Sequence, residues 1–217
     1  MGWGVSGRWI FCDFDGTIVE EEIFVALLRR FAPVESARTL PEIYALRVSL
    51  RDGLRRILET IPSAAWPEME DFVVRSAHIR AGFAEFAEAS RAAGWSLLVV
   101  TGGFQAMAEL VLAPFRSAIS AVHGLEVDRS GPFLHPYSPW ESADELVSKP
   151  AVYAHYAPEQ AICIGDSVTD LALARQCPRV FARDRLAEYL QREQRPWQAF
   201  ETFFDILPAL EAVHAAR

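Results

Sequence analysis

The feature of this 217-residue sequence that most constrains its fold is a series of short, almost uninterrupted apolar runs. Polar residues do not alternate with apolar ones inside these runs, which is typical of strands in a parallel sheet with helices on both faces. The strong runs are WIFCDF (9–14), SLLVVT (96–101), AICIG (161–165) and RVFAR (179–183), and a weaker one is AISAV (118–122).

Stretches with helical periodicity separate these runs, at residues 83–93, 105–112, 168–175 and 186–192. Such regular alternation of strand and helix predicts a doubly wound α/β domain with a parallel sheet. A hairpin is expected as well, because LEVD (125–128) and FLHPY (133–137) flank the turn residues RSGP.

Residues 18–81 interrupt this alternation, because no strand-like run occurs among them. Helical periodicity recurs there between proline breaks, at residues 20–31, 42–47, 51–60 and 66–77. We interpret this segment as a helical-bundle cap domain inserted after the first strand. Residues 1–17 and 82–217 would then form the catalytic core.

Charge and cysteine content restrict the partners and the compartment. The chain has a net charge of −8, and its sequence contains no block of basic residues. Nucleic-acid binding therefore has little support. Cys12, Cys163 and Cys177 are odd in number and widely spaced, which argues against a disulfide framework and fits a reducing cytoplasm. The apolar run at 9–12 is too short for a secretory signal, and no stretch approaches the roughly 18 apolar residues of a membrane span. We expect a cytoplasmic protein with no membrane partner; its oligomeric state stays open.

The motif DFDGT, from Asp13 to Thr17, ends the first strand, and open α/β sheets bind ligands at that edge. Two acids separated by one residue can share a metal ion and divide the chemistry, one attacking and the other moving a proton. An acidic turn after a strand is the simpler alternative, but the later motifs argue against it.

Three further motifs lie later in the chain, two of them after expected strands and one at the start of an expected helix. Thr101 precedes Gly102 and Gly103 at the entrance to a helix, where a hydroxyl and unhindered N–H groups can hold phosphate oxygens. Lys149 stands before Pro150, at the start of another helix.

The third of these motifs is IGDSVTD, which places Asp166 and Asp170 after a buried strand. Asp166 suits a magnesium site, since Mg²⁺ is held by one or two carboxylates with water and phosphate oxygens. Asp170 could instead be a helix cap paired with Ser167, and the sequence leaves both readings open.

Together these motifs resemble the four signatures of the haloacid dehalogenase superfamily, in order and over the core of the chain. The resemblance implies a magnesium-dependent phosphatase that acts on a small-molecule phosphate ester. It assigns Asp13 as the nucleophile that forms an aspartyl phosphate, and Asp15 as the general acid and base. A dehalogenase of this superfamily lacks an acid at the position of Asp15.

The same resemblance implies roles for the other positions. Mg²⁺ would be held by Asp13, Asp166 and the backbone carbonyl of Asp15. Thr101, Lys149 and local N–H groups would stabilise the transferring phosphoryl group, with Asp170 counted among the catalytic residues. Thr17, Gly102 and Gly103 would contribute to substrate binding.

The helical insert resembles the cap of phosphoserine phosphatases and their relatives, which closes over the substrate. Within that group the stretches FAP (31–33), HIRAGFAEF (78–86), IGDSVTD and FARDRL (181–186) are most similar to phosphatases of methionine salvage that act on 2-hydroxy-3-keto-5-methylthiopentenyl-1-phosphate.

Phosphoserine phosphatase is the alternative. It needs an acid for the amine, for which Glu22 is available, and a cap arginine for the carboxylate. The expected place of that arginine falls on Ile57, with Arg55 and Arg56 just before it, and adjacent helix positions differ by about 100°. A solvated helix face is the simpler explanation of Glu22 and Arg55.

Two alternatives lie outside phosphate hydrolysis. A non-catalytic phosphate-ester-binding protein would be expected only if the carboxylates were absent, and a phosphotransferase would need a cap that excludes water. His123 and His135 flank the expected hairpin and could face the cleft, although a lone histidine is more often a packed or surface residue.

Overall fold

The computed structural model describes residues 7–211. A seven-stranded sheet forms its centre, in the order β4-β3-β2-β1-β5-β6-β7. The strands are β1 (Arg8–Cys12), β2 (Ser96–Phe104), β3 (Ile119–Asp128), β4 (His135–Tyr137), β5 (Gln160–Gly165), β6 (Arg179–Ala182) and β7 (Gln198–Ala199).

All neighbouring strands run parallel except β4, which pairs antiparallel with β3. Strand β1 lies in the middle, with Phe11 facing Leu98 on β2 and Cys163 on β5. The expected doubly wound α/β fold is therefore confirmed. The expected hairpin is confirmed too, because Glu126 pairs with Tyr137 across it.

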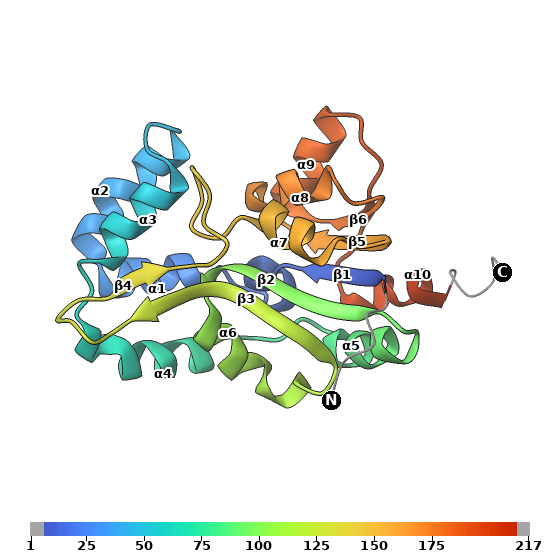
Figure 1. The fold of residues 1–217 in the computed structure, drawn as a ribbon, viewed down its shortest axis with the longest axis horizontal. Helices are drawn as coiled ribbons and strands as arrows, with labels where there is room; N and C mark the ends of the chain where they lie inside the picture. The colour runs from blue at the N-terminus through green and yellow to red at the C-terminus, as the bar shows by residue number, and fades with distance from the viewer. Residues whose placement is uncertain (1–6, 212–217) are drawn as a thin grey trace.

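Helices cover both faces of the sheet (Figure 1). In that view α5 (Phe83–Ala92) and α6 (Gln105–Leu112) lie below the sheet, and α7 (Lys149–Tyr156), α8 (Leu171–Ala174) and α9 (Asp184–Arg192) lie above it. This coverage explains the continuous apolar strands, since Ile10, Leu98 and Ile162 are all buried.

The C-terminal part of the described chain packs against the start of α5. Phe203 contacts Phe83 and Phe86, with ring centroids 5.1 and 5.0 Å away, and the N–H of Phe203 donates to the carbonyl of Ala81. Helix α10 (Leu207–Glu211) continues this packing.

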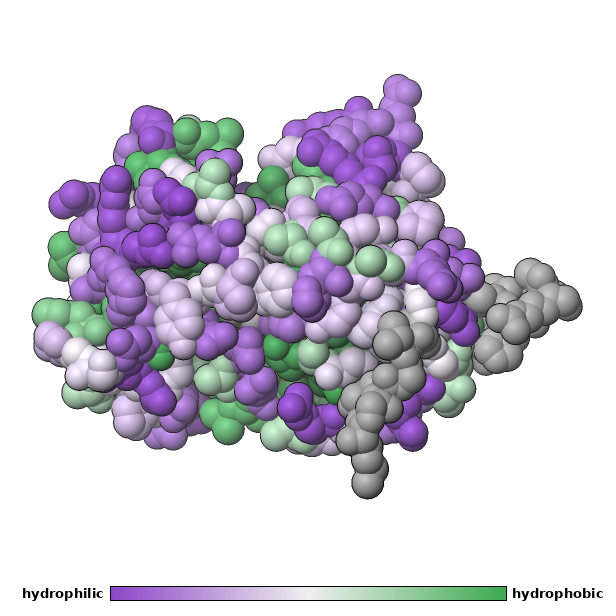
Figure 2. Space-filling view, viewed as in Figure 1, coloured by the Kyte–Doolittle hydropathy of each residue, from purple (hydrophilic) through white to green (hydrophobic). Residues whose placement is uncertain are grey.

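Four helices lie between β1 and α5, as the sequence predicts: α1 (Ile23–Phe31), α2 (Pro33–Tyr44), α3 (Leu50–Leu58) and α4 (Trp66–Ser76). Helices α2 and α3 rise above the sheet at one end of Figure 1. In the space-filling view the surface is notched between this lobe and the lobe of α8 and α9 (Figure 2).

One expected helix in this segment, at 42–47, is wrong. Pro33 does not break a helix but begins α2 as its first residue, where the missing N–H has no intrahelical partner to lose. Pro41 lies inside the same helix, which continues to Tyr44. Burial of Leu40 and Ile43 against α3 favours the continuous helix despite the lost hydrogen bond.

No helix within residues 7–211 combines the length and the apolar character that crossing a membrane requires.

Candidate active site

The candidate site lies at the carboxyl edge of the three central strands. Asp13 follows β1, and its N–H donates to the carbonyl of Ile164 on β5, 2.9 Å away. Thr101 lies near the end of β2, and Asp166 follows β5. Because parallel strands end at the same edge, residues far apart in sequence meet here.

The chain turns tightly after Asp13, and Gly16 makes this possible. Gly16 has φ of 70°, and a Cβ placed on it would lie 2.8 Å from the carboxyl carbon of Asp166. The absence of a side chain therefore lets the turn and the Asp166 carboxylate approach each other. Thr17 fixes the contact, since its hydroxyl donates to Oδ1 of Asp166 over 3.2 Å.

Lys149 links two of the acids. Its Nζ donates to Oδ1 of Asp13 at 2.6 Å and to Oδ1 of Asp170 at 2.5 Å, and the side chain is only 3% exposed. Ser148 caps α7 through the N–H of Ala151, so Lys149 enters the site from the first turn of a helix. A buried ammonium of this kind needs such paired carboxylates.

Asp170 has two structural tasks at once. Its Oδ2 accepts from the N–H of Ser167 at 3.1 Å and of Asp166 at 3.3 Å, which completes a capping box. Its Oδ1 holds Lys149. The geometry therefore confirms the helix cap, whereas a catalytic role of Asp170 stays a prediction.

Asp13, Asp166 and Asp170 form a buried cluster in which one oxygen atom from each carboxyl group lies within 4.8 Å of the others. Against these three carboxylates Lys149 supplies one positive charge. The surplus of negative charge in a desolvated place, together with the oxygen-only donor set, fits a hard divalent cation such as Mg²⁺.

The electrostatics of the site reflect this surplus. Burial, with the nearby carboxylate of Asp170 second, raises the pKa of Asp13 and raises that of Asp166 to about 7. Burial lowers the pKa of Lys149, but attraction to Asp13 and Asp170 outweighs it, so the net pKa lies above its ordinary value. Lys149 is therefore charged, and added positive charge would favour the ionised acids.

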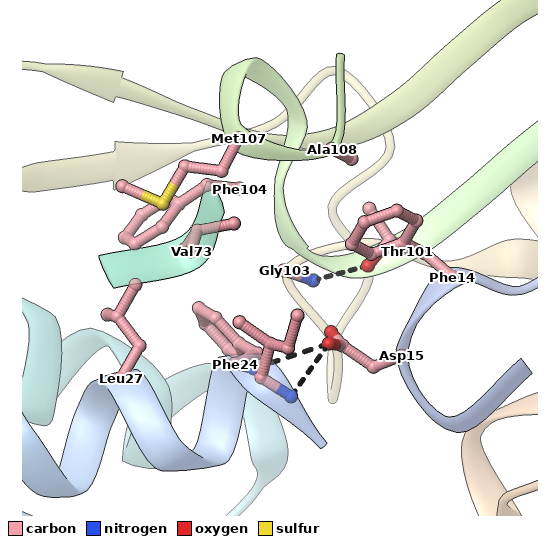
Figure 3. Close-up of a pocket in the computed structure, with 11 residues that line it drawn as sticks. Phe14, Asp15, Phe24, Leu27, Val73, Thr101, Gly103, Phe104, Met107 and Ala108 are labelled. Carbon is pink, nitrogen blue, oxygen red and sulfur yellow. Dashed lines mark hydrogen bonds between the residues drawn. The ribbon is translucent and has the colours of Figure 1, made fainter. Parts of the chain in front are cut away.

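The side chain of Asp15 points towards the first turn of α1 (Figure 3). Its Oδ1 accepts from the N–H of Ile23 at 3.0 Å and of Phe24 at 3.3 Å. Burial, and then the charges of Asp13 and Glu22, raise the pKa of Asp15 to about 8. At neutral pH this carboxyl group carries a proton, which a general acid requires.

The last residues of β2 leave backbone accessible near Asp15. The hydroxyl of Thr101 accepts from the N–H of Gly103 at 2.9 Å. A Cβ on Gly102 would meet nothing within 4 Å, so open space adjoins the backbone there. At Gly103 a Cβ would lie 3.4 Å from Asp15 and Phe24, which marks a close approach of strand and helix.

Arg80 is a site-supporting residue to which the sequence pattern assigned no role. Its Nε donates to the carbonyl of Thr17 at 2.7 Å and its Nη2 to that of Gly16 at 2.8 Å. The guanidinium is buried and also reaches the carbonyl of Glu201 at 3.4 Å. It thus fixes the turn that carries Thr17. Arg80 lies in the stretch HIRAGFAEF, which is one of those that carry the family resemblance. Nothing in the neighbouring residues indicates that its side chain binds the turn at Gly16 and Thr17.

The expected substrate-binding residues of the helical segment have different surroundings. Glu22 precedes α1; desolvation raises its pKa, Asp170 adds to this, and Arg185 and Lys149 oppose it. Glu22 therefore interacts electrostatically with Asp170 and Lys149 of the site. Arg55 on α3 pairs with Glu141 of the loop between β4 and α7, at 3.1 Å.

The two histidines are engaged elsewhere. His123 packs against Trp140 and shares a hydrogen bond of 2.7 Å with the hydroxyl of Tyr156. His135 contacts Glu59 at 3.0 Å on the surface. Neither contact involves the acidic cluster.

Comparisons of the sequence with known proteins point to one family of hydrolases. Residues 10–175 match the family model of haloacid dehalogenase-like hydrolases. A 2-hydroxy-3-keto-5-methylthiopentenyl-1-phosphate phosphatase of Microcystis aeruginosa is 40% identical over 91% of this chain and 94% of its own length. Its namesake from Brevibacillus brevis is 36% identical over 94% of this chain and 95% of its own.

Solved structures share the fold. The phosphoserine phosphatase from T. onnurineus superposes with a TM-score of 0.72 at 13% identity, covering 97% of this chain and 98% of that chain. A phospho-aspartyl intermediate analogue of phosphoserine phosphatase gives a TM-score of 0.67 at 16% identity, covering 94% and 99%.

Proposed function

This chain belongs to the haloacid dehalogenase-like hydrolase family, and on that premise we propose that it hydrolyses 2-hydroxy-3-keto-5-methylthiopentenyl-1-phosphate through an aspartyl phosphate. The observation that carries the proposed chemistry is the buried Asp13 carboxylate, held by Lys149 at the sheet edge with Asp15 two residues away. The substrate is proposed from the relatives of that name, which align along nearly the whole chain.

Asp13 is the nucleophile in this proposal. Lys149 holds Oδ1 of Asp13, which leaves Oδ2 to attack phosphorus. The new bond joins that oxygen to phosphorus, and the bond between phosphorus and the ester oxygen breaks with its electron pair on the departing oxygen. Lys149, the hydroxyl of Thr101 and the backbone around Gly102 stabilise the charge on the transferring group.

Asp15 moves the protons. Its protonated carboxyl group gives a proton to the departing oxygen and then, as a carboxylate, takes one from water. That water attacks the aspartyl phosphate, inorganic phosphate leaves, and Asp13 regains its carboxylate. The N–H groups of Ile23 and Phe24 both bind Oδ1 of Asp15, which leaves Oδ2 to carry the proton.

Asp13, Asp166 and the backbone carbonyl of Asp15 would hold Mg²⁺, with Thr17 orienting Asp166. When bound, the ion supplies positive charge that neutralises the phosphate. Asp170 holds Lys149 and caps the loop that carries Asp166, so its proposed contribution to catalysis is positional.

Residues 18–81 serve as a cap over a core of residues 1–17 and 82–217 in this proposal. The cap helices α2 and α3 stand beside the notch in the surface, where closure would exclude water from the phosphate (Figure 2). Glu22 and Arg55, both on this segment, would contact the substrate once the cap closes.

Phosphoserine hydrolysis remains the second candidate, because Glu22 lies within the field of Lys149 and Asp170 and could bind an amine. The ion pair between Arg55 and Glu141 weakens it, since that arginine is engaged with the loop before α7. The chain retains the carboxyl groups of Asp13 and Asp15, and their presence disfavours a non-catalytic phosphate-ester-binding protein.

Release of inorganic phosphate tests these candidates. The purified protein is given the keto-1-phosphate or phosphoserine, each with Mg²⁺ or with EDTA. We expect magnesium-dependent release with kcat/KM at least tenfold higher for the keto-1-phosphate. Faster turnover of phosphoserine would overturn the proposed substrate, and binding without release of phosphate from either ester would overturn the proposed reaction.

A further inference from the structure

A small apolar cavity lies next to Asp15, between the helical segment and the core (Figure 3). Its apolar walls come from three elements: α1 gives Phe24 and Leu27, α4 gives Val73, and the junction of β2 and α6 gives Phe104 and Met107. The cavity therefore spans the contact between the proposed cap and the core.

One end of this cavity is polar and the other apolar. Asp15 and Thr101 are the polar side chains among the described residues that line it, and Figure 3 shows them together at one side. Leu27, Val73 and Met107 lie at the opposite side. A molecule that reacts beside Asp15 can thus extend an apolar group away from this carboxyl group.

The apolar end is suited to a thioether. The rings of Phe24 and Phe104 meet edge to face at 5.4 Å, and sulfur makes favourable contacts with aromatic rings. Leu27, Val73 and Met107 are almost completely buried, so a group placed among them is removed from water.

The size of the cavity limits what can enter. Its volume of about 20 Å³ corresponds to a single water molecule or methyl group. Met107 has three rotatable bonds and can move to admit a slightly larger group. The cavity therefore fits the end of a short chain and excludes a bulky one.

We propose that this cavity binds the methylthio end of the substrate and makes the enzyme select for an apolar tail. The inference rests on the proposed function and adds a subsite to it. The charged tail of phosphoserine would lose its hydration among the apolar side chains, so the same cavity would discriminate against that substrate.

The test compares two keto-1-phosphates that differ only in the tail, one with the methylthio group and one with hydrogen in its place. In the unmodified protein we expect kcat/KM to be about 10–200-fold higher for the methylthio compound. Met107→Trp fills the cavity and should remove most of this preference. Leu110→Trp, on the exposed side of the same helix, is the matched control and should retain it.

A second variant guards against misfolding of the first. Ala108→Leu enlarges a side chain of the cavity wall by less than Met107→Trp does. It should also reduce the preference for the methylthio compound, by about tenfold or more. Equal kcat/KM for the two compounds in the unmodified protein, or an unchanged preference in both filled variants, would overturn the subsite while leaving the proposed function intact. Absence of turnover for both keto-1-phosphates, with turnover of phosphoserine, would overturn the proposed function and this inference with it.

Discussion

The ion pairs at the strand ends are buried, whereas the ion pair of Arg55 on the helical segment is partly exposed to solvent. Lys149, Asp13 and Asp170 are buried and depend on one another for hydrogen bonds. Arg55 and Glu141 meet at the surface, each about one-third exposed. Breaking a buried pair leaves an uncompensated charge, whereas an exposed pair exchanges its partner for water.

This difference teaches that the proposed chemistry depends on buried charges of the core, whereas the proposed access depends on partly exposed contacts of the helical segment. A cluster of buried charges keeps its geometry because every alternative is costly. Contacts that water can replace permit the helical segment to move, which a proposed cap requires.

Asp13→Asn should have the largest effect. The amide cannot form the proposed aspartyl phosphate, so turnover should fall by at least about 10³-fold. Phosphate release measures this, and circular dichroism checks that the fold is retained. Turnover within tenfold of the unmodified protein would assign the nucleophile to another residue.

Lys149→Met should destabilise the core most. The variant leaves the carboxylates of Asp13 and Asp170 buried without their cation, at a cost of about 3–5 kcal/mol. Urea denaturation with EDTA present measures the free energy of unfolding. A loss below about 1 kcal/mol would mean that the cluster behaves like a surface pair.

Arg80→Lys should weaken the site without removing a reacting group. Lysine keeps the charge but cannot donate to the carbonyls of Gly16 and Thr17 in the same fork. Because Thr17 orients Asp166, we expect the magnesium concentration for half-maximal activity to rise by about 10–100-fold. An effect on stability alone, with the same magnesium dependence, would show that Arg80 supports only the fold. Arg183→Lys, which changes a half-buried arginine near the same carbonyl of Glu201, is the control.

The pH dependence should report Asp15. Its pKa is raised to about 8, so the acid form is present below that pH and is lost above it. The rate of the step that needs this proton should fall about tenfold per pH unit above pH 8. Single-turnover kinetics between pH 6 and 10 would show it. The same shift affects stability: the folded protein holds a proton that the unfolded chain releases above its ordinary value of 3.8, so the free energy of unfolding should decrease from about pH 4 to pH 8.

Arg55→Ala should have the smallest effect on stability, about 0–1 kcal/mol, because its ion pair with Glu141 is partly exposed. Thermal unfolding of this variant beside Lys149→Met sharpens the comparison directly. A destabilisation of Arg55→Ala as large as that of Lys149→Met would remove the distinction between the two regions.

The expected helices of the segment show where sequence patterns fail. The ends of α1, α3 and α4 agree with the periodicity to within a few residues, because amphipathic spacing is a local property. Pro41 gave the wrong boundary, since packing of Leu40 and Ile43 on α3 outweighs a local preference. Long-range burial decides such cases and leaves no signal in the neighbouring residues.

By itself the sequence determined the class of fold and the meeting of Asp13 and Asp166. Apolar runs without alternation require a covered parallel sheet, and parallel strands bring the residues that follow them to one edge. Only the tertiary structure decided that Asp170 both caps a helix and holds Lys149, and that Asp15 turns towards α1. It also decided that Arg80 secures a turn 63 residues earlier in the chain. These arrangements depend on the direction of side chains across distant segments, which residue order alone does not specify.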